Sequence, residues 1–332
     1  MAARGKLRLD PFLLAIIAAA VLATVLPARG AAVDALAWAT KAAIFALFFL
    51  YGARMHPEEA LRGLRHWRLH VTILAFTFVV FPLVGLALRA LSPGLLASAL
   101  YPGLLYVTLC PSTVQSSINF TSIARGNVAG AIVSASASNL LGVFVTPLLA
   151  IALMNTTGNA NVGLGSILDI CAQILLPFVL GQLSRRWTAE FVARHKRLKL
   201  FDQFSIVLVV YAAFSSGVRE NIWSMVGALD IAVLVLVCLA VLGAMLWVTW
   251  ATARRLGFDR ADAIAIQFCG TKKSLATGLP MATVLFAGQP IGLIMLPLMV
   301  FHQAQLMACS ALASRYARTA PAAAASGPQD AT

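Results

Sequence analysis

Long apolar stretches alternate with short polar ones along most of this chain. The apolar runs reach about 18 residues or more, the length a helix needs to cross ~30 Å of hydrocarbon. Charged residues and helix breakers divide the chain into ten predicted spans, at 11–27, 36–53, 69–90, 98–123, 127–153, 165–183, 201–218, 226–252, 261–287 and 290–314. The pattern predicts an all-α polytopic membrane protein with ten transmembrane helices.

The composition agrees with this class. Hydrophobic residues make up 60% of the chain and charged residues only 11%, whereas a soluble domain is about 25% charged. We therefore expect residues 1–318 to form a single transporter membrane domain within the lipid bilayer. Residues 319–332 are of low complexity and are expected to form a disordered cytoplasmic tail.

The basic residues lie mostly in alternate loops. With the N-terminus placed in the cytoplasm, 19 of the 25 lysines and arginines fall on the cytoplasmic side. The other six are Arg29, Arg89 and Arg219 on the outer side, and Lys41, Lys272 and Lys273 within spans. This asymmetry predicts cytoplasmic termini, and it explains the net charge of +13 without a nucleic-acid partner. The short Ala-rich chain is typical of bacteria, so we expect the bacterial inner membrane.

The first apolar run, at 11–27, has two possible interpretations. The basic start before the first apolar run also fits a signal peptide, but the loop charges favour a retained first span. No sequence feature defines an oligomeric state.

The ten spans suggest two halves of five. Their midpoint falls in the uncharged loop at 155–166, which gives one repeat at about 11–153 and a second at about 165–314. An odd number of spans per half inverts the second copy, as in many secondary transporters. Two short echoes agree with the division, LYGAR with SSGVR and LCPST with FCGTK.

Spans 98–123 and 261–287 are both interrupted by polar residues and helix breakers. The first contains Pro111, Thr113, Gln115, Ser116, Ser117 and Asn119, and the second contains Gly270, Thr271, Lys272, Lys273, Ser274, Gly278 and Pro280. Lys272 lies eleven residues after Ala261, or ~16 Å along a helix, which is near the bilayer midplane. Matched breaks at the midplane of two antiparallel spans predict a substrate or ion site.

These two interruptions carry a resemblance to a known family. CPSTVQSSINFTSIARGNVAGAIV at 110–133 and GTKKSLATGLP at 270–280 resemble the bile acid:sodium symporter family, in its divergent SBF-like branch. The resemblance implies a secondary active symporter of organic anions. It also implies that broken spans 4 and 9 cross, and that a panel of spans 1, 2, 6 and 7 moves against a core of spans 3–5 and 8–10.

The same residues depart from the sodium-coupled pattern. The resemblance implies an acidic residue where Phe268 stands, and Gln and Asn where Lys272 and Lys273 stand. The fifth-span hydroxyls of the family's sodium site fall at Ala131 and Ala135. Sodium needs oxygen ligands, so sodium as a cofactor is doubtful here. A sodium-independent carrier, a proton-linked carrier, a polar-lined channel and a non-transporting regulator of ion homeostasis stay open.

The two lysines suggest two roles. One ammonium could act as a tethered cation, occupying helix-end carbonyls near Gly270 that sodium occupies in the relatives. The other could attract a small organic anion. The sequence does not assign either role to a particular lysine.

Secondary candidates lie around these positions. Asp169 is the one carboxylate well inside a predicted span, while His302 and Gln305 share a helix face that favours interhelical hydrogen bonds. Gln267 fits either the same cavity or an interhelical hydrogen bond. The five cysteines lack C-x-x-C spacing, so neither a disulfide nor a metal site is expected. No enzyme motif appears, which favours a transporter over a catalyst.

Overall fold

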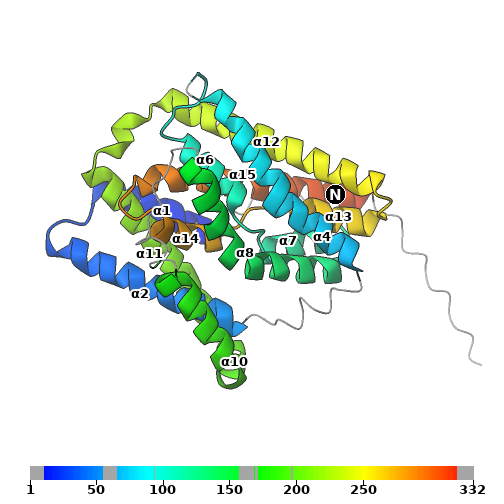
Figure 1. Ribbon diagram of the computed structural model, residues 1–332, viewed down its shortest axis with the longest axis horizontal. Coiled ribbons are helices and arrows are strands. Elements are labelled where there is room, and N and C mark those ends of the chain that lie inside the picture. The colour runs from blue at the N-terminus through cyan, green and yellow to red at the C-terminus, as the bar shows by residue number, and fades with distance from the viewer. Residues whose placement is uncertain are drawn as a thin grey trace, which may run out of the picture.

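The computed structural model describes residues 11–54, 66–92, 94–156, 168, 171–195 and 197–319 (Figure 1). Every regular element in these ranges is helical. The first half contains α1 (Pro11–Val25), α2 (Ala31–Arg54), α4 (Trp67–Ala75), η2 (Phe76–Val80), α5 (Phe81–Ala87), η3 (Leu88–Leu91), α6 (Tyr101–Leu109), α7 (Gln115–Ile123) and α8 (Val128–Thr156). The second contains η4 (Cys171–Leu175), α10 (Leu176–Arg194), α11 (Leu198–Arg219), η5 (Ile222–Met225), α12 (Ala228–Arg255), α13 (Arg260–Thr271), α14 (Leu275–Leu285) and α15 (Ile291–Arg318).

Six helical stretches in the described ranges are long and apolar enough to cross a membrane. They are Ala31–Arg54, Trp67–Leu91, Val128–Met154, Leu200–Arg219, Ala228–Arg255 and Ile291–Arg318. Large apolar side chains such as Leu148 and Leu236, each 65% exposed, point outward from them. An apolar exterior of this extent suits contact with lipid.

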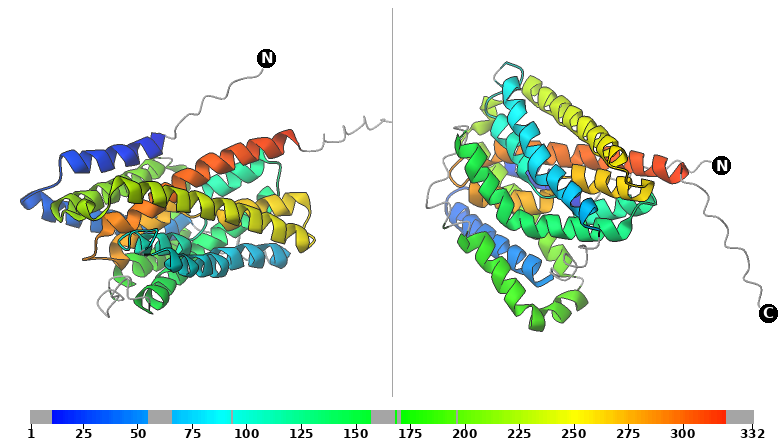
Figure 2. Two further views of the ribbon diagram at one scale, coloured as in Figure 1. Left: turned by 90° about the horizontal axis from the view of Figure 1, so that it is seen from above. Right: turned by 45° about the vertical axis from the view of Figure 1, so that its right-hand side comes forward.

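The helices form two packed groups. Helices α1, α2, η4–α10 and α11 pack on one another and are called the four-helix group below, and the remaining helices form the main group. Figure 2 shows α2 and α10 side by side at one edge of the molecule. Glycines allow this close approach, because a Cβ at Gly52 would lie 2.1 Å from the Phe178 carbonyl oxygen and one at Gly181 2.1 Å from that of Phe49. The two groups meet mainly where α11 packs against α14 and α15.

Four predicted spans are irregular in the described residues, and one of them is 165–183, which contains the π-helix η4. The span at 98–123 is two helices, α6 and α7, and the span at 261–287 is also two helices, α13 and α14. The span at 69–90 stays continuous but widens into the π-helix η2. The segments 110–114 and 272–274 are called the first break and the second break below.

Local chemistry fixes the ends of these helices. Pro111 lacks an N–H and disfavours helical backbone at the residue before it, and Cys110 indeed turns to extended backbone with ψ of 150°, which ends α6. Asp259 caps α13 by accepting from the Asp262 N–H at 2.7 Å. Ser274 caps α14 by accepting from the Thr277 N–H at 3.2 Å.

One predicted boundary is wrong. The sequence placed a basic loop at 184–200, but α10 continues to Arg194 and α11 begins at Leu198. A helix is not obliged to end at the limit of its apolar run, because its backbone bonds are internal and polar side chains can continue it into water. Arg185 and Arg186 therefore lie on a helix.

Candidate binding site between the two broken helices

The ammonium of Lys273 is bound by backbone carbonyls from two other elements. Its Nζ donates to the carbonyl oxygens of Thr77 at 3.0 Å, Thr108 at 2.7 Å and Cys110 at 2.9 Å. It also lies 4.2 Å from the ring centroid of Phe81, and the side chain is 0% exposed. Three acceptors match the three N–H donors of an ammonium group.

These carbonyls are available because their helices are irregular. In η2 the Phe81 N–H donates to the Phe76 carbonyl, which shifts the register by one residue. The donor in that register for Thr77 is residue 82, a proline without an N–H. In the first break the Ser112 N–H donates to the Ser138 hydroxyl and not to Thr108. Lys273 therefore fills positions that the helices leave open.

Each backbone carbonyl from residue 108 to residue 112, at the end of α6 and in the first break, accepts a hydrogen bond from a different donor group or a shared ammonium. Lys273 binds the carbonyls of Thr108 and Cys110. The others are bound by Thr146 Oγ1 on Leu109 at 2.9 Å, the Ser274 N–H on Pro111 at 2.8 Å and Asn139 Nδ2 on Ser112 at 2.5 Å. Five consecutive carbonyls thus accept from outside α6 and α7, from α8 and from the second break.

Lys272 has a different environment although it is the adjacent residue. Its Nζ donates to the Ser116 carbonyl at 2.8 Å and lies 3.8 Å from the ring centroid of Phe120 and 5.5 Å from that of Phe268. Its side chain is also 0% exposed. No acidic side chain in the described ranges forms an ion pair with either lysine. The two charges rest on carbonyl dipoles and aromatic faces.

The second break is held by α15. Gln305 accepts from the Lys273 N–H and donates to the Lys273 carbonyl, both at 2.8 Å. His302 Nδ1 lies 2.9 Å from the Gln305 amide nitrogen and 3.4 Å from the Lys273 carbonyl oxygen. The expected interhelical role of His302 and Gln305 therefore takes place at the break itself.

Hydroxyl groups of the first break and of the first turn of α7 contact backbone carbonyls near the end of α13. Ser112 Oγ donates to the Cys269 carbonyl at 2.6 Å, and Ser117 Oγ lies 3.4 Å from the Phe268 carbonyl oxygen. Thr113 Oγ1 lies 2.6 Å from Ser116 Oγ and 3.1 Å from Ser117 Oγ. The two breaks are thus one polar network.

Other predicted residues lie at the edge of this network. Thr271 Oγ1 is 3.2 Å from Thr249 Oγ1 of α12. Gln267 forms interhelical hydrogen bonds, donating to the Leu246 carbonyl at 2.8 Å and accepting from the Tyr316 hydroxyl at 2.9 Å. Of its two expected roles, the structure therefore places Gln267 in interhelical bonding.

The remaining candidates are packing residues, exposed residues or undescribed ones. Gly270 and Gly278 are buried, and a Cβ at Gly278 would lie 2.7 Å from a Leu298 methyl carbon. Pro280 lies inside α14. Gln115 and Asn119 are exposed on α7, whereas both lysines are buried. Asp169 lies outside the described residues.

Sequence reasoning did not single out Thr77, which supplies a carbonyl, or Phe81 and Phe120, which supply rings. Pro82 was the available signal for Thr77, because a proline inside a span frees a carbonyl about one turn earlier. The aromatic residues gave no comparable signal, since apolar spans contain many of them.

The motif ARGNVA joins the two broken spans at their other end. Asn127 Nδ2 donates to Asp262 of α13 at 2.7 Å, and its N–H donates to the Ala261 carbonyl at 2.9 Å. Gly126 permits the contact, because a Cβ there would lie 2.5 Å from a methyl carbon of Ile264. Arg125 makes the turn with a positive φ of 55°.

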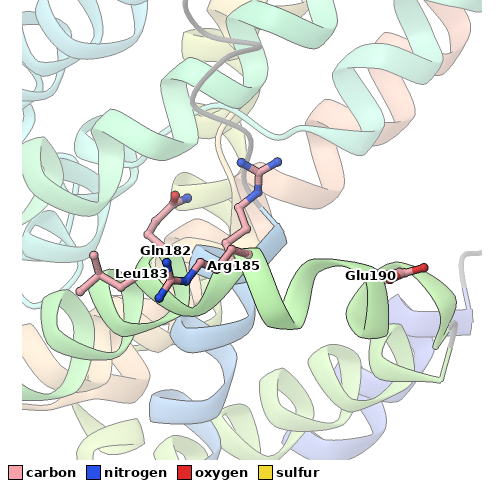
Figure 3. Close-up of a pocket in the computed structure, with 5 residues that line it drawn as sticks. Gln182, Leu183, Arg185 and Glu190 are labelled. Atoms are coloured by element: carbon pink, nitrogen blue, oxygen red, sulfur yellow. The ribbon is translucent and has the colours of Figure 1, made fainter.

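A surface pocket lies elsewhere. It measures about 480 Å³ and is lined by Gln182, Leu183, Arg185, Arg186 and Glu190. Figure 3 shows Gln182, Leu183 and Arg185 gathered on one part of α10, with Glu190 further along the helix. None of the predicted site residues lines this pocket.

The fold and the network define an integral membrane protein of the transporter class, with polar helix breaks packed against each other. The chain belongs to the SBF-like CPA transporter family, whose profile matches residues 10–318. This confirms the family expected from the two motifs.

Several relatives cover nearly the same length. "Uncharacterized protein PA2026" of Pseudomonas aeruginosa is 50% identical over 311 residues, which are 93% of each chain. "Putative symporter YfeH" of Escherichia coli is 48% identical over 93% of each chain. "Sodium/bile acid cotransporter 7" of Xenopus tropicalis is 30% identical over 92% of this chain and 91% of its own. The last two of these names are names of transporters.

Proposed function

We propose that this protein is a secondary active carrier that moves a small organic anion across the bacterial inner membrane by alternating access, without a strict requirement for sodium. The proposal includes ten spans in two inverted five-helix repeats, with spans 4 and 9 crossing at the breaks and both termini in the cytoplasm. It is supported by the family and by the names of the relatives. A proton-linked carrier and a regulator without net flux are the alternatives that the experiments below separate.

The observation that carries the proposal is the carbonyl cage around Lys273. Three backbone oxygens at 2.7 to 3.0 Å surround its ammonium. Oxygen cages of this kind also suit hard cations such as sodium. An ammonium tethered in the cage supplies a positive charge from the chain itself, so no free cation has to enter for the breaks to stay together.

The ammonium of Lys272 is the proposed attraction for the anion. It has one carbonyl acceptor and two aromatic neighbours, against three carbonyls for Lys273. An ammonium has three donors, so Lys272 retains bonding capacity that an anion can use once α7 shifts and uncovers it. The absence of an acidic partner among the described residues leaves the site positive overall.

The exposed face of α7 supports a solute path to the break. Gln115, Asn119 and Ser122 are all exposed and follow each other at helical spacing. A helix that faces only lipid does not carry amides in this way, because their hydrogen-bonding groups would be unsatisfied. A polar solute or water beside α7 would satisfy them.

Uptake by proteoliposomes tests the function. We expect saturable uptake of at least one member of a panel of sterol, sulfated and carboxylate anions, at equal rates in sodium and in choline chloride. Uptake that depends on a pH gradient identifies the proton-linked alternative. A strict sodium requirement contradicts the proposal, and ligand binding without net flux supports a regulator.

Removal of the tethered cation tests the cage itself. Lys273→Ala empties the cage, and we expect the detergent-purified variant to be stabilised by sodium chloride more than by choline chloride at the same ionic strength. Lys272→Ala is the matched control and should show no such preference, because it empties no cage. The combined change of Lys272→Gln and Lys273→Asn should abolish normal uptake; unchanged uptake would refute the tethered-cation role.

A further inference from the structure

Tyr51 forms a hydrogen bond between the two helix groups next to the second break. Its hydroxyl, on α2 of the four-helix group, donates to the Ala276 carbonyl in the first turn of α14 at 3.3 Å. Ala276 follows Lys273 by three residues. The bond therefore connects the four-helix group to the helix that leaves the candidate binding site.

The sequence explains why this carbonyl accepts a side chain. In a regular helix the Ala276 carbonyl would accept from the N–H of residue 280, but that residue is Pro280 and has no N–H. Tyr51 supplies a donor in its place. The same proline that was expected to break the helix thus creates an acceptor on the face toward α2.

A second tyrosine provides an internal comparison. The hydroxyl of Tyr106, on α6, donates to the Gly278 carbonyl of α14 at 2.8 Å. Helices α6 and α14 both belong to the main group, so this bond lies within one packed unit. The two hydroxyls bind carbonyls two residues apart, from different groups of helices.

Tyr51 is held firmly on its own side. Arg54 on the same helix forms an ion pair with Asp202 of α11, and Gly52 packs closely against α10. The ring of Phe48 lies edge-on to that of Tyr51, with centroids 5.8 Å apart. A displacement of the four-helix group against α14 would therefore break the Tyr51 bond, since the side chain cannot simply follow α14.

We propose that Tyr51 is a positioning residue for transport: its bond to the carbonyl freed by Pro280 stabilises the described arrangement of the two helix groups against the alternate one. This inference deepens the proposed function and rests on it for the existence of a second arrangement. Loss of the hydroxyl lowers the population of the described arrangement. The loss of Tyr106 leaves that population unchanged.

Spin-label distances measure these populations directly. Labels are placed at Leu183→Cys on α10 and Leu236→Cys on α12, which are 68% and 65% exposed. The background carries Cys171→Ser, because Cys171 is the exposed one of the free cysteines in the described ranges. Measurements use the full chain in liposomes, without substrate and in choline chloride, so they do not depend on the identity of the anion or on sodium.

Tyr51→Phe should shift the ratio of the two distance populations by about threefold, the effect of an average interhelical hydrogen bond in a membrane protein. Tyr106→Phe makes the same chemical change and should lower the thermal stability without shifting the ratio. Pro280→Ala restores the helical donor to Ala276, so Tyr51→Phe should have a much smaller effect in that background.

Three results would overturn the inference. They are an unchanged ratio in Tyr51→Phe, an equal shift in Tyr106→Phe, and a single distance population in every variant. The expected shift of the population ratio in Tyr51→Phe, found together with no anion uptake by the unsubstituted protein, would instead overturn the proposed function and leave the positioning role in place.

Discussion

The two breaks differ in how their backbone groups are satisfied. Five consecutive carbonyls at the end of α6 and in the first break, 108–112, accept donors from α8 and from the second break. The second break has three residues and supplies two ammonium groups. Its backbone N–H and carbonyl at Lys273 are hydrogen-bonded by the side chain of Gln305. The first break therefore needs hydrogen-bond donors for its carbonyls, and the second break provides some of these donors. The comparison shows that the breaks are complementary parts of one structure and not two independent kinks.

The same asymmetry appears between the two lysines. All three N–H donors of the Lys273 ammonium have carbonyl acceptors within the protein, whereas the Lys272 ammonium has one carbonyl acceptor. Adjacent identical residues thus separate into a residue that holds the fold and a residue with capacity for a ligand. Substitutions that treat the two members of a matched pair alike can test this separation.

Lys273→Met should produce the largest loss of stability. It removes the donor from three buried carbonyls, each of which costs about 1–3 kcal/mol when left unsatisfied. Removal of a buried charge offsets part of this cost, but the orphaned carbonyls remain. We expect the melting temperature in detergent to fall by far more for Lys273→Met than for Lys272→Met, because the Ser116 carbonyl that Lys272 binds lies inside the regular helix α7 and keeps its backbone donor. Equal melting temperatures would show that the cage does not hold the breaks.

Much of the fold followed from the sequence, because apolar runs and prolines act locally. The two breaks and their polar residues were predicted from Pro111 and from the double lysine. The partners of Lys273 were not. The prediction placed one of the two lysines, without saying which, on carbonyls near Gly270, whereas the structure places Lys273 on the carbonyls of Thr77, Thr108 and Cys110. A lysine side chain spans several ångströms and reaches across helices, so its acceptor depends on tertiary packing. The sequence has no local signal for that.

Asn139→Ala should have the next largest effect on stability. Asn139 of α8 donates to the Ser112 carbonyl at 2.5 Å and accepts from Thr277 Oγ1 at 2.9 Å, so it joins both broken spans. Its loss orphans one buried carbonyl, at a cost of about 1–3 kcal/mol. The melting temperature of the purified protein measures the loss.

Asn119→Ala is the matched control for this change. Asn119 is exposed on α7, so its removal should leave the melting temperature unchanged and lower anion uptake. A destabilised Asn119→Ala, or a fully stable Asn139→Ala, would remove the distinction between the buried network and the solute path.

A pair of threonines gives the most selective test and, at Thr271, the smallest expected loss of stability. Thr146→Val removes the hydroxyl that donates to the Leu109 carbonyl of the first break and leaves that buried acceptor empty. Thr271→Val, at the end of α13, removes a hydroxyl contact with Thr249, whose hydroxyl still donates to the Met245 carbonyl at 2.7 Å. We expect about 1–3 kcal/mol for Thr146→Val and about 0.6 kcal/mol for Thr271→Val. The side chains change identically, so the two losses in the free energy of unfolding can be compared directly. Their ratio shows how strongly each break depends on hydroxyl donors. A larger loss at Thr271 would mean that the second break, and not the first, is the one short of hydrogen-bond donors.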